Sequence, residues 1–433
     1  MICMSRNSQA SERIDAFSGA DQSFSAGYQE TRFAEDFHLR EAYGPLLTEQ
    51  LSTVDTWQFK KDISVGFTYD SNIFSSRNDP KDDIFYTYSP TLGVRRKGHK
   101  SYIENFYTLS YVDYVEDQKL SRPNQKNTTK MEYKTDKLSI NVSNVFEPNT
   151  AYAIGERTEL KAAETSKVIT YTDDANMEIN YKITPKTSFD FDWNYKIFYF
   201  PVSGNSLAAN SFSSQTHIFT PGLFYQITPK TSVFAKYGFE IVDFFQGGGF
   251  ASKAMSTTVG VAGKITPKTG LSASLGYKTR KYNETSLGNF EGYTFRAAVS
   301  RRFLPKIAGT VSYSRDTQED FSIQGSRSTS QEVEFFGLNL TWFLYPHLTL
   351  DGGASAGFNS RQGLFTKVDP ENSTLTFTRP EETHFYEWNL NLNWHPRPFV
   401  EFFIGYKYFN HGGTFKGFQY DDQRLTATGS LRF

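Results

Sequence analysis

The chain has 433 residues, a formal net charge of −1, 38% hydrophobic residues and 16% aromatic residues, with 40 Phe and 26 Tyr. The near-zero charge gives no bulk electrostatic reason to expect nucleic-acid binding, and the aliphatic content is low for an ordinary globular domain. The single cysteine, Cys3, excludes an intrachain disulfide and a cysteine-based metal site, and the lack of any apolar run of about 18 residues argues against a transmembrane helix.

The first part of the chain differs from the rest, because residues 1–56 are polar and show no alternation. Met1–Gln22 lacks the apolar core of a secretory signal, so we expect the natural start to lie upstream or the sequence to have been trimmed. Arg32–Leu51 has the composition of one short helix, which Gly44-Pro45 would interrupt. Three alternatives stay open for this N-terminal extension: disorder, a place in the periplasm, or a plug inside a barrel.

From residue 57 onward, apolar and polar residues alternate at the period of two that is typical of strands. In Ser188–Phe200 one face is mainly aromatic, and the other face is polar with Asp190, Asp192 and Lys196. Tyr386–Trp394 repeats the pattern. Such strands suit either a membrane β-barrel, which is apolar outside, or a soluble antiparallel sandwich, which is apolar inside.

Aromatic residues at the strand ends favour the membrane barrel over the sandwich. They gather at the turn side and again near the far loops, as in the two interface girdles of a membrane barrel. Many strands also run to about a dozen residues, longer than is usual in sandwiches. The girdle residues are Tyr181, Tyr225, Phe303, Trp342 and Trp394 on the turn side, and Tyr199 and Tyr408 on the far side.

A turn recurs through the second half of the chain. It reads Ile-Thr-Pro-Lys-Thr at 183–187, 227–231 and 265–269, with looser versions at 304–307, 345–348 and 395–398. Proline fixes φ and lacks an N–H, so it fits a tight turn and not a central strand. Each period fits two transmembrane strands of about ten residues, one tight turn and one longer loop. A β-propeller, with four short strands in each repeat, is disfavoured because these strands are long.

The whole pattern predicts an up-and-down antiparallel barrel of about 18 strands, with both termini on the periplasmic side. The short connections all fall on one side and the long ones, such as Ser360–Glu382, on the other. The expected strands are 57–69, 84–96, 101–115, 126–135, 138–147, 167–183, 188–200, 212–227, 232–244, 251–265, 270–282, 290–303, 308–316, 330–344, 348–359, 383–394, 399–410 and 420–433.

The chain ends on an alternating strand with Leu431 and the terminal aromatic Phe433 on one face. A barrel in lipid leaves no strand edge unpaired, so the last strand is expected to pair with the first. We interpret Phe433 and Leu431 as an assembly signal. This predicts the bacterial outer membrane as the location, with outer-membrane lipid and the barrel assembly machinery as partners.

Four segments near the start of the barrel resemble a known family. They are Tyr69-Asp-Ser-Asn-Ile-Phe74, Asp82-Asp-Ile-Phe-Tyr-Thr-Tyr-Ser-Pro90, Thr91-Leu-Gly-Val-Arg-Arg-Lys-Gly98 and Tyr107-Thr-Leu-Ser-Tyr-Val-Asp-Tyr114. Their order resembles the β-barrel porin family often encoded beside exopolysaccharide biosynthesis genes. The resemblance implies an outer-membrane location and a role in transport, possible solutes being small hydrophilic molecules or polysaccharide.

The sequence does not predict an enzyme, a cofactor or a metal centre. The histidines show no metal-ligand spacing, and His99, two residues before Ser101, falls in a predicted turn. The acidic group of Asp79, Asp82 and Asp83 is a candidate for a divalent cation, although a solvated loop is the simpler interpretation. No glycine-rich phosphate loop follows a strand.

The functional residues are expected on the polar faces of the strands, which would line the lumen. Both signs occur, so we predict passive diffusion of small hydrophilic solutes or saccharides through a hydrated channel. The family resemblance implies a link to exopolysaccharide export. The alternatives are a closed structural or adhesive barrel that acts through its loops, and a secreted soluble β-sandwich binding protein. The candidate lumen residues are Glu178, Lys182, Asp190, Asp192, Lys196, Lys236, Glu240, Lys278, Arg280, Arg296, Arg302, Asp351, Glu387, Glu401, Lys407, Arg424 and Arg432.

Overall fold

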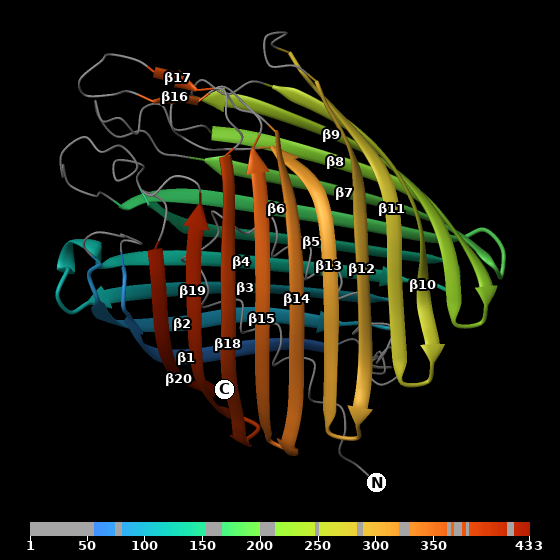
Figure 1. Cartoon of the computed structure of the whole chain (residues 1–433). Helices are drawn as coiled ribbons and strands as arrows, with labels where there is room; N and C mark the ends of the chain where they lie inside the picture. The colour runs from blue at the N-terminus through green and yellow to red at the C-terminus, as the bar shows by residue number, and fades with distance from the viewer. Residues whose placement is uncertain are drawn as a thin grey trace.

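The computed structural model describes residues 56–73, 80–152, 167–199, 213–246, 251–283, 289–319, 330–361, 365–367, 375–377, 381–413 and 420–433. Its main feature is one closed antiparallel sheet of 18 strands, in which strands that follow each other in the chain lie side by side (Figure 1). The strands are β1 Thr56–Asp70, β2 Asp83–Lys97, β3 Ser101–Tyr114, β4 Arg122–Lys134, β5 Leu138–Tyr152, β6 Lys167–Lys182, β7 Thr187–Tyr199, β8 Ser213–Thr228, β9 Thr231–Gln246, β10 Ser252–Thr266, β11 Thr269–Tyr282, β12 Phe290–Leu304, β13 Ile307–Glu319, β14 Ser330–Tyr345, β15 Leu348–Arg361, β18 Glu381–Arg397, β19 Val400–Gly413 and β20 Tyr420–Arg432.

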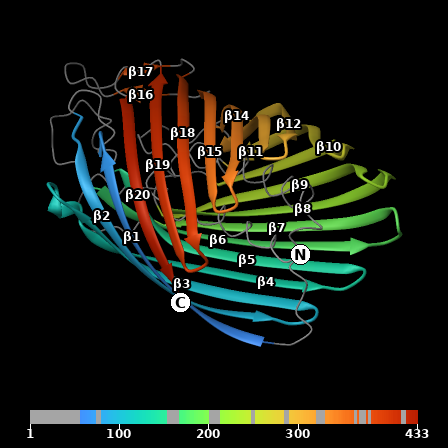
Figure 2. The same cartoon turned by 90° about the horizontal axis from the view of Figure 1, so that it is seen from below.

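The sheet closes because β20 pairs with β1, as the sequence predicted. The register runs from Asp62 opposite Arg432 to Asp70 opposite Arg424. The backbone N–H of Phe433 donates to the carbonyl of Lys61 at 2.8 Å, which extends the pairing to the last residue. Figure 2 shows β20 and β1 lying side by side in the wall. Closure leaves no free edge, which is the condition for a sheet in lipid.

The strand bounds agree with the prediction to within a few residues for most of the sheet. The prediction was wrong for the connection at Glu116–Gln125, because β4 already begins at Arg122. A short 3-10 helix, Gln118–Leu120, makes the connection instead. This part of β4 includes Pro123, which pairs with Tyr111 inside the sheet.

Pairing also continues beyond the predicted ends of three other strands. The fifth strand reaches Tyr152 and the thirteenth reaches Glu319. The fifteenth ends at Arg361, inside the segment predicted as the longest loop. Further along this segment, β16 (Phe365–Lys367) and β17 (Leu375–Phe377) form a small separate two-stranded sheet. Figure 1 shows this hairpin at the end of the barrel opposite the tight turns.

The recurring proline turns owe their shape to their first threonine. The Oγ1 atom of Thr184 accepts hydrogen bonds from the backbone N–H groups of Lys186 (3.2 Å) and Thr187 (3.0 Å). Thr228 and Thr266 accept from the N–H groups two residues on, both at 3.3 Å. Side chains that bond the backbone two residues ahead favour turns. The repeated motif therefore marks the tight-turn end of the barrel.

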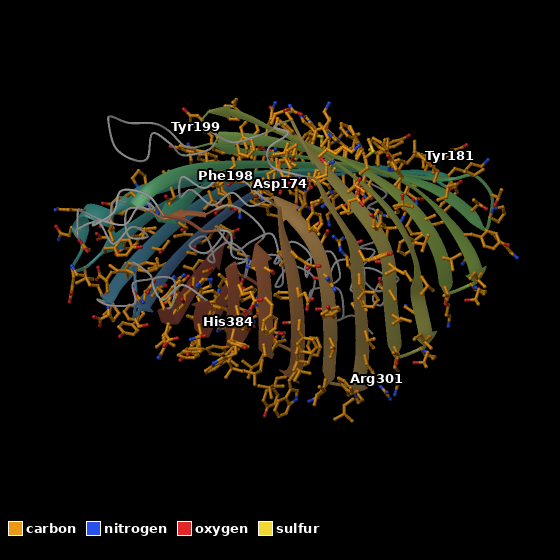
Figure 3. The ribbon with its side chains drawn as sticks, turned by 45° about the horizontal axis from the view of Figure 1, so that its top comes forward. Asp174, Tyr181, Phe198, Tyr199, Arg301 and His384 are labelled. Carbon is orange, nitrogen blue, oxygen red and sulfur yellow. The ribbon has the colours of Figure 1, made fainter. Side chains whose placement is uncertain are left out.

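Most of the outer face of the barrel is apolar between two belts of aromatic side chains. The turn-side residues predicted as a girdle, including Tyr181 and Trp394, have large exposed side chains. Tyr199 marks the opposite end, and Figure 3 shows Tyr181 and Tyr199 on the outside of the barrel. Among the described residues, no helix is long and apolar enough to cross a membrane.

A closed barrel with an apolar outer face and two aromatic belts matches the requirements of a lipid bilayer, since all its strand hydrogen bonds are made within the sheet. Bacterial outer-membrane proteins have this architecture. The chain is therefore a bacterial outer-membrane β-barrel. The N-terminal extension predicted for residues 1–56 lies outside the described residues except for Thr56, and it stays a prediction.

Candidate functional site

The candidate site is the inner wall of the barrel, which carries most of the charged side chains of the strands. In β1, Val65 faces outward with 47% of its surface exposed, whereas Asp62 and Asp70, which alternate with it, are buried. Residues opposite each other in the register share a face, so this assignment extends from strand to strand around the sheet. All seventeen predicted lumen residues occupy positions that alternate with the outward ones.

The largest charged cluster on the inner wall joins β9, β11, β12 and β13. Glu240 accepts from Arg280 at 2.7 Å and from Lys278 at 3.1 Å. Asp316 is 3.6 Å from Lys278 and 2.5 Å from Arg296. We call these five residues the basic cluster, because three cations against two anions leave one positive charge in excess.

Arg280 is fully buried within this cluster. Its Nη1 donates to the hydroxyl of Ser252 at 2.8 Å, and its Nη2 donates to Glu240. A buried guanidinium is tolerated only when an anion and hydrogen-bond acceptors surround it. The geometry on the wall therefore fixes Arg280 in place.

A second group of inner residues, on β6 and β7, is acidic. Glu178 accepts from the amide of Asn141 at 3.2 Å, and Asp190 accepts from Asn180. Asp192 is 3.0 Å from Lys236 of β9. We call Glu178, Asp190 and Asp192 the acidic wall, since their partners are two neutral amides and one lysine. Excess negative charge on β6 and β7 thus lies four strands from excess positive charge on β11.

The remaining predicted residues are spread around the wall. Glu387 is 3.2 Å from Lys407, and Asp351 accepts from the amide of Asn393 at 2.9 Å. Lys196 lies opposite Asp174 in the register. Lys182 and Arg302 are exposed near the turn ends of β6 and β12, away from the clusters.

Charged pairs also line the inner side of the seam where β20 meets β1. Arg424 is 3.1 Å from Asp70 and 2.7 Å from Asp422. Arg432 pairs with Glu401 and lies 4.0 Å from Asp62. Salt bridges thus support the closing pair of strands on the inner face, in addition to the backbone hydrogen bonds.

The segment Tyr69–Ile73, which carries part of the family resemblance, continues this seam toward the external end. Asp70 accepts from the backbone N–H of Asn72 at 2.9 Å. The buried amide of Asn72 donates to the carbonyl of Asp421 at 3.0 Å, and Ser71 bonds the backbone of Gln423 in both directions. In this structure the motif has a structural role, because it ties the first strand to the last.

Aromatic rings also lie on the inner wall, each against a glycine of a neighbouring strand. A Cβ atom added to Gly93 would lie 2.2 Å from the ring of Phe106. A Cβ atom added to Gly357 would lie 2.0 Å from the ring of Phe385. Phe385 belongs to a buried cluster with Phe335 and Phe409, and Tyr420 packs against it. An aromatic ring that packs over a glycine of the neighbouring strand helps to fix the register of the two strands.

Several inner residues were not predicted from the sequence. Asp316, Asp70 and Asp422 lie near strand ends, and the sequence placed those ends in or beside loops. Arg95 and Glu104 pair at 2.9 Å, but the facing of 101–115 was ambiguous because aromatic residues occur on both faces of β3. The alternation of the strands was the signal available for the first three, because Asp316 and Asp422 lie within the predicted strands 308–316 and 420–433, and Asp70 lies one residue beyond 57–69.

The acidic group Asp79, Asp82 and Asp83 has no metal geometry in the described part of the chain, and Asp79 lies outside it. Asp83 accepts from three backbone N–H groups, those of Ile84 (2.6 Å), Glu116 (3.1 Å) and Asp117 (3.0 Å). Its carboxylate therefore organises the connection after β3. The described residues contain no group of three or more His, Cys, Asp or Glu side chains arranged to hold a metal ion.

Comparison with known proteins found matches only among solved structures, because no protein-family model and no curated protein matches the chain. OpdK of Pseudomonas aeruginosa, in a crystal structure with vanillate, matches with a TM-score of 0.46 and 8% identity over 87% of this chain and 99% of OpdK. OpdQ of the same organism matches with a TM-score of 0.47 and 10% identity over 87% of this chain and 98% of OpdQ. The FrpB iron transporter of Neisseria meningitidis matches with a TM-score of 0.46 and 9% identity over 89% of this chain and 83% of FrpB. Similarities at this level carry no information about the solute of this chain.

Proposed function

We propose that this barrel is a passive channel for small hydrophilic solutes across the bacterial outer membrane. The observation that supports the proposal most directly is the separation of charge on its inner wall. The acidic wall on β6 and β7 and the basic cluster on β9 to β13 lie on different sectors of a closed sheet. Barrels of sixteen to eighteen strands leave an aqueous channel unless a loop or plug fills them.

The mechanism is diffusion through water under a field that points across the lumen. Cations are drawn toward Glu178, Asp190 and Asp192, and anions toward the excess positive charge near Arg280. A polar solute with a dipole is oriented by the same field, while an apolar solute gains nothing and must displace ordered water. The proposal involves no catalytic step and no cofactor.

Within this proposal, saccharides are candidate solutes because they combine many hydroxyl groups with no net charge. Amide side chains on the inner wall, such as Asn180 and Asn393, supply donors and acceptors that suit hydroxyl groups. A link to exopolysaccharide export rests on the sequence resemblance at residues 67–115 alone.

Single-channel conductance of the refolded full-length protein in a planar bilayer tests the proposal. Stable current steps are expected. The variant lacking residues 1–51 should be measured beside it, because a larger step in the shorter chain would identify the N-terminal extension as a plug. Insertion of both proteins without current steps would contradict the proposal.

The second candidate function is a closed barrel that acts through its external loops. The buried cluster of Phe335, Phe385 and Phe409 favours it, since three aromatic rings at 5 to 7% exposure lie on the inner face near the external end. The conductance measurement separates the two candidates: a silent but heat-modifiable, membrane-inserted barrel would support this one.

A further inference from the structure

The outer face of the barrel is polar in one sector, on β3 to β6. The outward residues there include Gln125, Asn127 and Thr129 at three successive outward positions of β4. Asn105 of β3 lies opposite Thr129, Asn144 of β5 lies opposite it on the other side, and Asp173 of β6 follows. We call these six residues the outer polar patch; Figure 2 shows that its four strands form one continuous part of the wall.

The register shows that these side chains face outward. Tyr107, Leu109 and Met131 share the same face and are among the exposed large hydrophobic residues of the barrel. Asn105 and Tyr107 alternate with the inward Glu104, whose side chain is paired with Arg95. Residues opposite each other in the register share a face. Asn144 lies opposite the outward Thr129, and Asp173 lies opposite the outward Phe146, so both side chains also face outward.

The patch lies at the depth of the lipid tails. Thr129 and Asn127 are five and seven residues from the end of β4, and Asn144 is six residues from the start of β5. At about 3.3 Å per residue and a tilt of about 40°, these side chains lie about 13 to 18 Å from the turn side, within an apolar band about 25 Å tall. At the same depth on β18 and β19, the outward residues are Leu390, Leu392 and Tyr406.

The polar side chains bond one another along the patch. The amide of Asn105 donates to Asn127 Oδ1 at 3.1 Å and to Thr129 Oγ1 at 2.7 Å, and the Thr129 hydroxyl donates to Asn127 at 3.2 Å. The amide of Asn144 donates to Asp173 at 2.5 Å. A polar group facing hydrocarbon costs free energy unless its hydrogen-bonding capacity is used.

The hydrogen bonds among the described residues of one barrel leave an unused donor on β4 and an unused acceptor on the neighbouring strand β5. An asparagine side chain has two donor hydrogens and an oxygen with two lone pairs. In the described part of the chain, Asn127 uses its oxygen as acceptor and its amide hydrogens donate to no protein atom. Asn144 uses its amide as donor and its oxygen accepts from none. The two residues thus offer a donor and an acceptor at similar depth.

We propose that the outer polar patch is the interface of a two-fold dimer of this chain. A two-fold axis along the membrane normal, passing between β4 and β5, brings β4 of one copy against β5 of the other at equal depth. The free amide hydrogens of Asn127 then meet the free oxygen of Asn144 in the partner, twice. The same surface serves both copies, as an isologous contact requires, and both barrels keep the same orientation in the membrane. Interhelical and interstrand polar contacts of this kind stabilise association in lipid.

Cross-linking with a cysteine beside the patch tests this interface. In a Cys3→Ser background, Val142→Cys places a thiol on the outward face of β5, two residues from Asn144 and outside the patch. The dimer predicts efficient disulfide cross-linking of this full-length variant in oxidised outer membranes. Ile404→Cys, on the outward face of β19, is the matched control and should remain monomeric.

A second pair of substitutions ties the cross-link to the patch. Adding Asn127→Leu and Asn144→Leu to the Val142→Cys variant is expected to reduce cross-linking by about tenfold or more, the effect of losing two to four polar contacts in lipid. Heat-modifiable mobility of each variant checks that the barrel has folded. Equal cross-linking at positions 142 and 404, no cross-linking at 142, or cross-linking unchanged by the leucines in a folded barrel would overturn the proposal.

Discussion

Arg280 shows how a single charged side chain is accommodated in the wall of this barrel. It is fully buried, and Glu240 is its acidic partner at 2.7 Å. Lys278 contacts the same carboxylate, so Glu240 is shared between two cations. Removal of that one carboxylate would leave two positive charges close together, and the cost of burying Arg280 would no longer be offset.

We therefore expect Glu240→Gln to lower the free energy of unfolding by about 3 kcal/mol, the usual cost of breaking a buried ion pair. The measurement is the midpoint of the heat-modifiable mobility shift, or of urea unfolding in liposomes. Lys407→Gln is the control, since Lys407 is partly exposed and pairs with Glu387 at 3.2 Å; its loss is expected to cost about 1 kcal/mol or less. Equal effects of the two substitutions would contradict the role assigned to burial.

Two glycines of β15 provide a matched pair for the inner and outer faces. A Cβ on Gly357 would approach the ring of Phe385 to 2.0 Å, whereas a Cβ on Gly352 would find its nearest neighbour, Leu390, at 3.7 Å. We expect Gly357→Ala to destabilise the barrel by about 1 to 3 kcal/mol, because the ring must move, and Gly352→Ala to change stability by less than about 1 kcal/mol. Unfolding midpoints of the two variants check this, and the reverse order would show that Phe385 does not lie on Gly357.

At the scale of the element, the strands β6 and β7 act together as the acidic wall. Their aromatic residues face lipid, and Glu178, Asp190 and Asp192 face inward, a direct consequence of the period of two. Because two of the three carboxylates are held by neutral amides, their charges are not cancelled locally. The pair of strands thus forms one surface of negative potential.

Replacement of both Asp190 and Asp192 by Asn should reduce the preference of the channel for cations. Two unit charges about 4 Å apart in water interact by about 1 kcal/mol, which corresponds to a factor of about five in local ion concentration, so the permeability ratio is expected to shift by up to that factor. Reversal potentials in a salt gradient measure it. Lys253→Gln, outward on β10, is the control and should leave the ratio unchanged; an unchanged ratio in the double variant would remove the acidic wall from the conduction path.

Most elements of the fold could be predicted from the sequence, because alternation and turn chemistry are local signals. The proline turns and the aromatic strand ends gave the strand count and the order. Strand ends were harder to predict: the segment 116–125 was expected to be a loop, although β4 begins at Arg122. Asp316 and Asp422 lie within predicted strands but were not named as lumen residues, and Glu104 was missed because β3 carries aromatic residues on both faces.

The pairing partners on the inner wall could not be predicted, since they depend on the stagger between strands. Lys278, for example, reaches Glu240 two strands away and Asp316 two strands away on the other side. Alternation gives the face of each residue and not its height relative to residues on other strands. The outer polar patch likewise became visible only when β3 to β6 were aligned by their register.

At the scale of the whole molecule, the last residue of the chain takes part in closing the barrel. The backbone N–H of Phe433 donates to the carbonyl of Lys61 at 2.8 Å. The residue is 71% exposed and lies at the turn end of the barrel. It therefore combines a bond across the seam with an aromatic group accessible from the periplasmic side.

Deletion of Phe433 is expected to reduce the amount of heat-modifiable, membrane-inserted protein several-fold, because the terminal aromatic residue is proposed to be an assembly signal and the seam loses its last hydrogen bonds. Immunoblots of outer-membrane fractions without boiling measure this. Phe433→Trp, which keeps an aromatic ring and the backbone bonds, is the control and should assemble. Normal levels of the deletion variant would contradict the assembly role.

The seam has a consequence for the order in which the barrel folds. Neighbouring strands follow each other in the chain, within about 20 residues, but Asn72 and Asp421, which bond at the seam, are 349 residues apart. Bringing such distant segments together directly would cost about 5 kcal/mol of loop-closure entropy, whereas hairpins form at little cost. We therefore expect the strands to add one after another and the contacts around Asn72 to form last. Contacts that form after the rate-limiting step stabilise the native state mainly by slowing unfolding, so on this folding order the segment Tyr69–Ile73 is expected to lengthen the time for which a finished barrel stays closed.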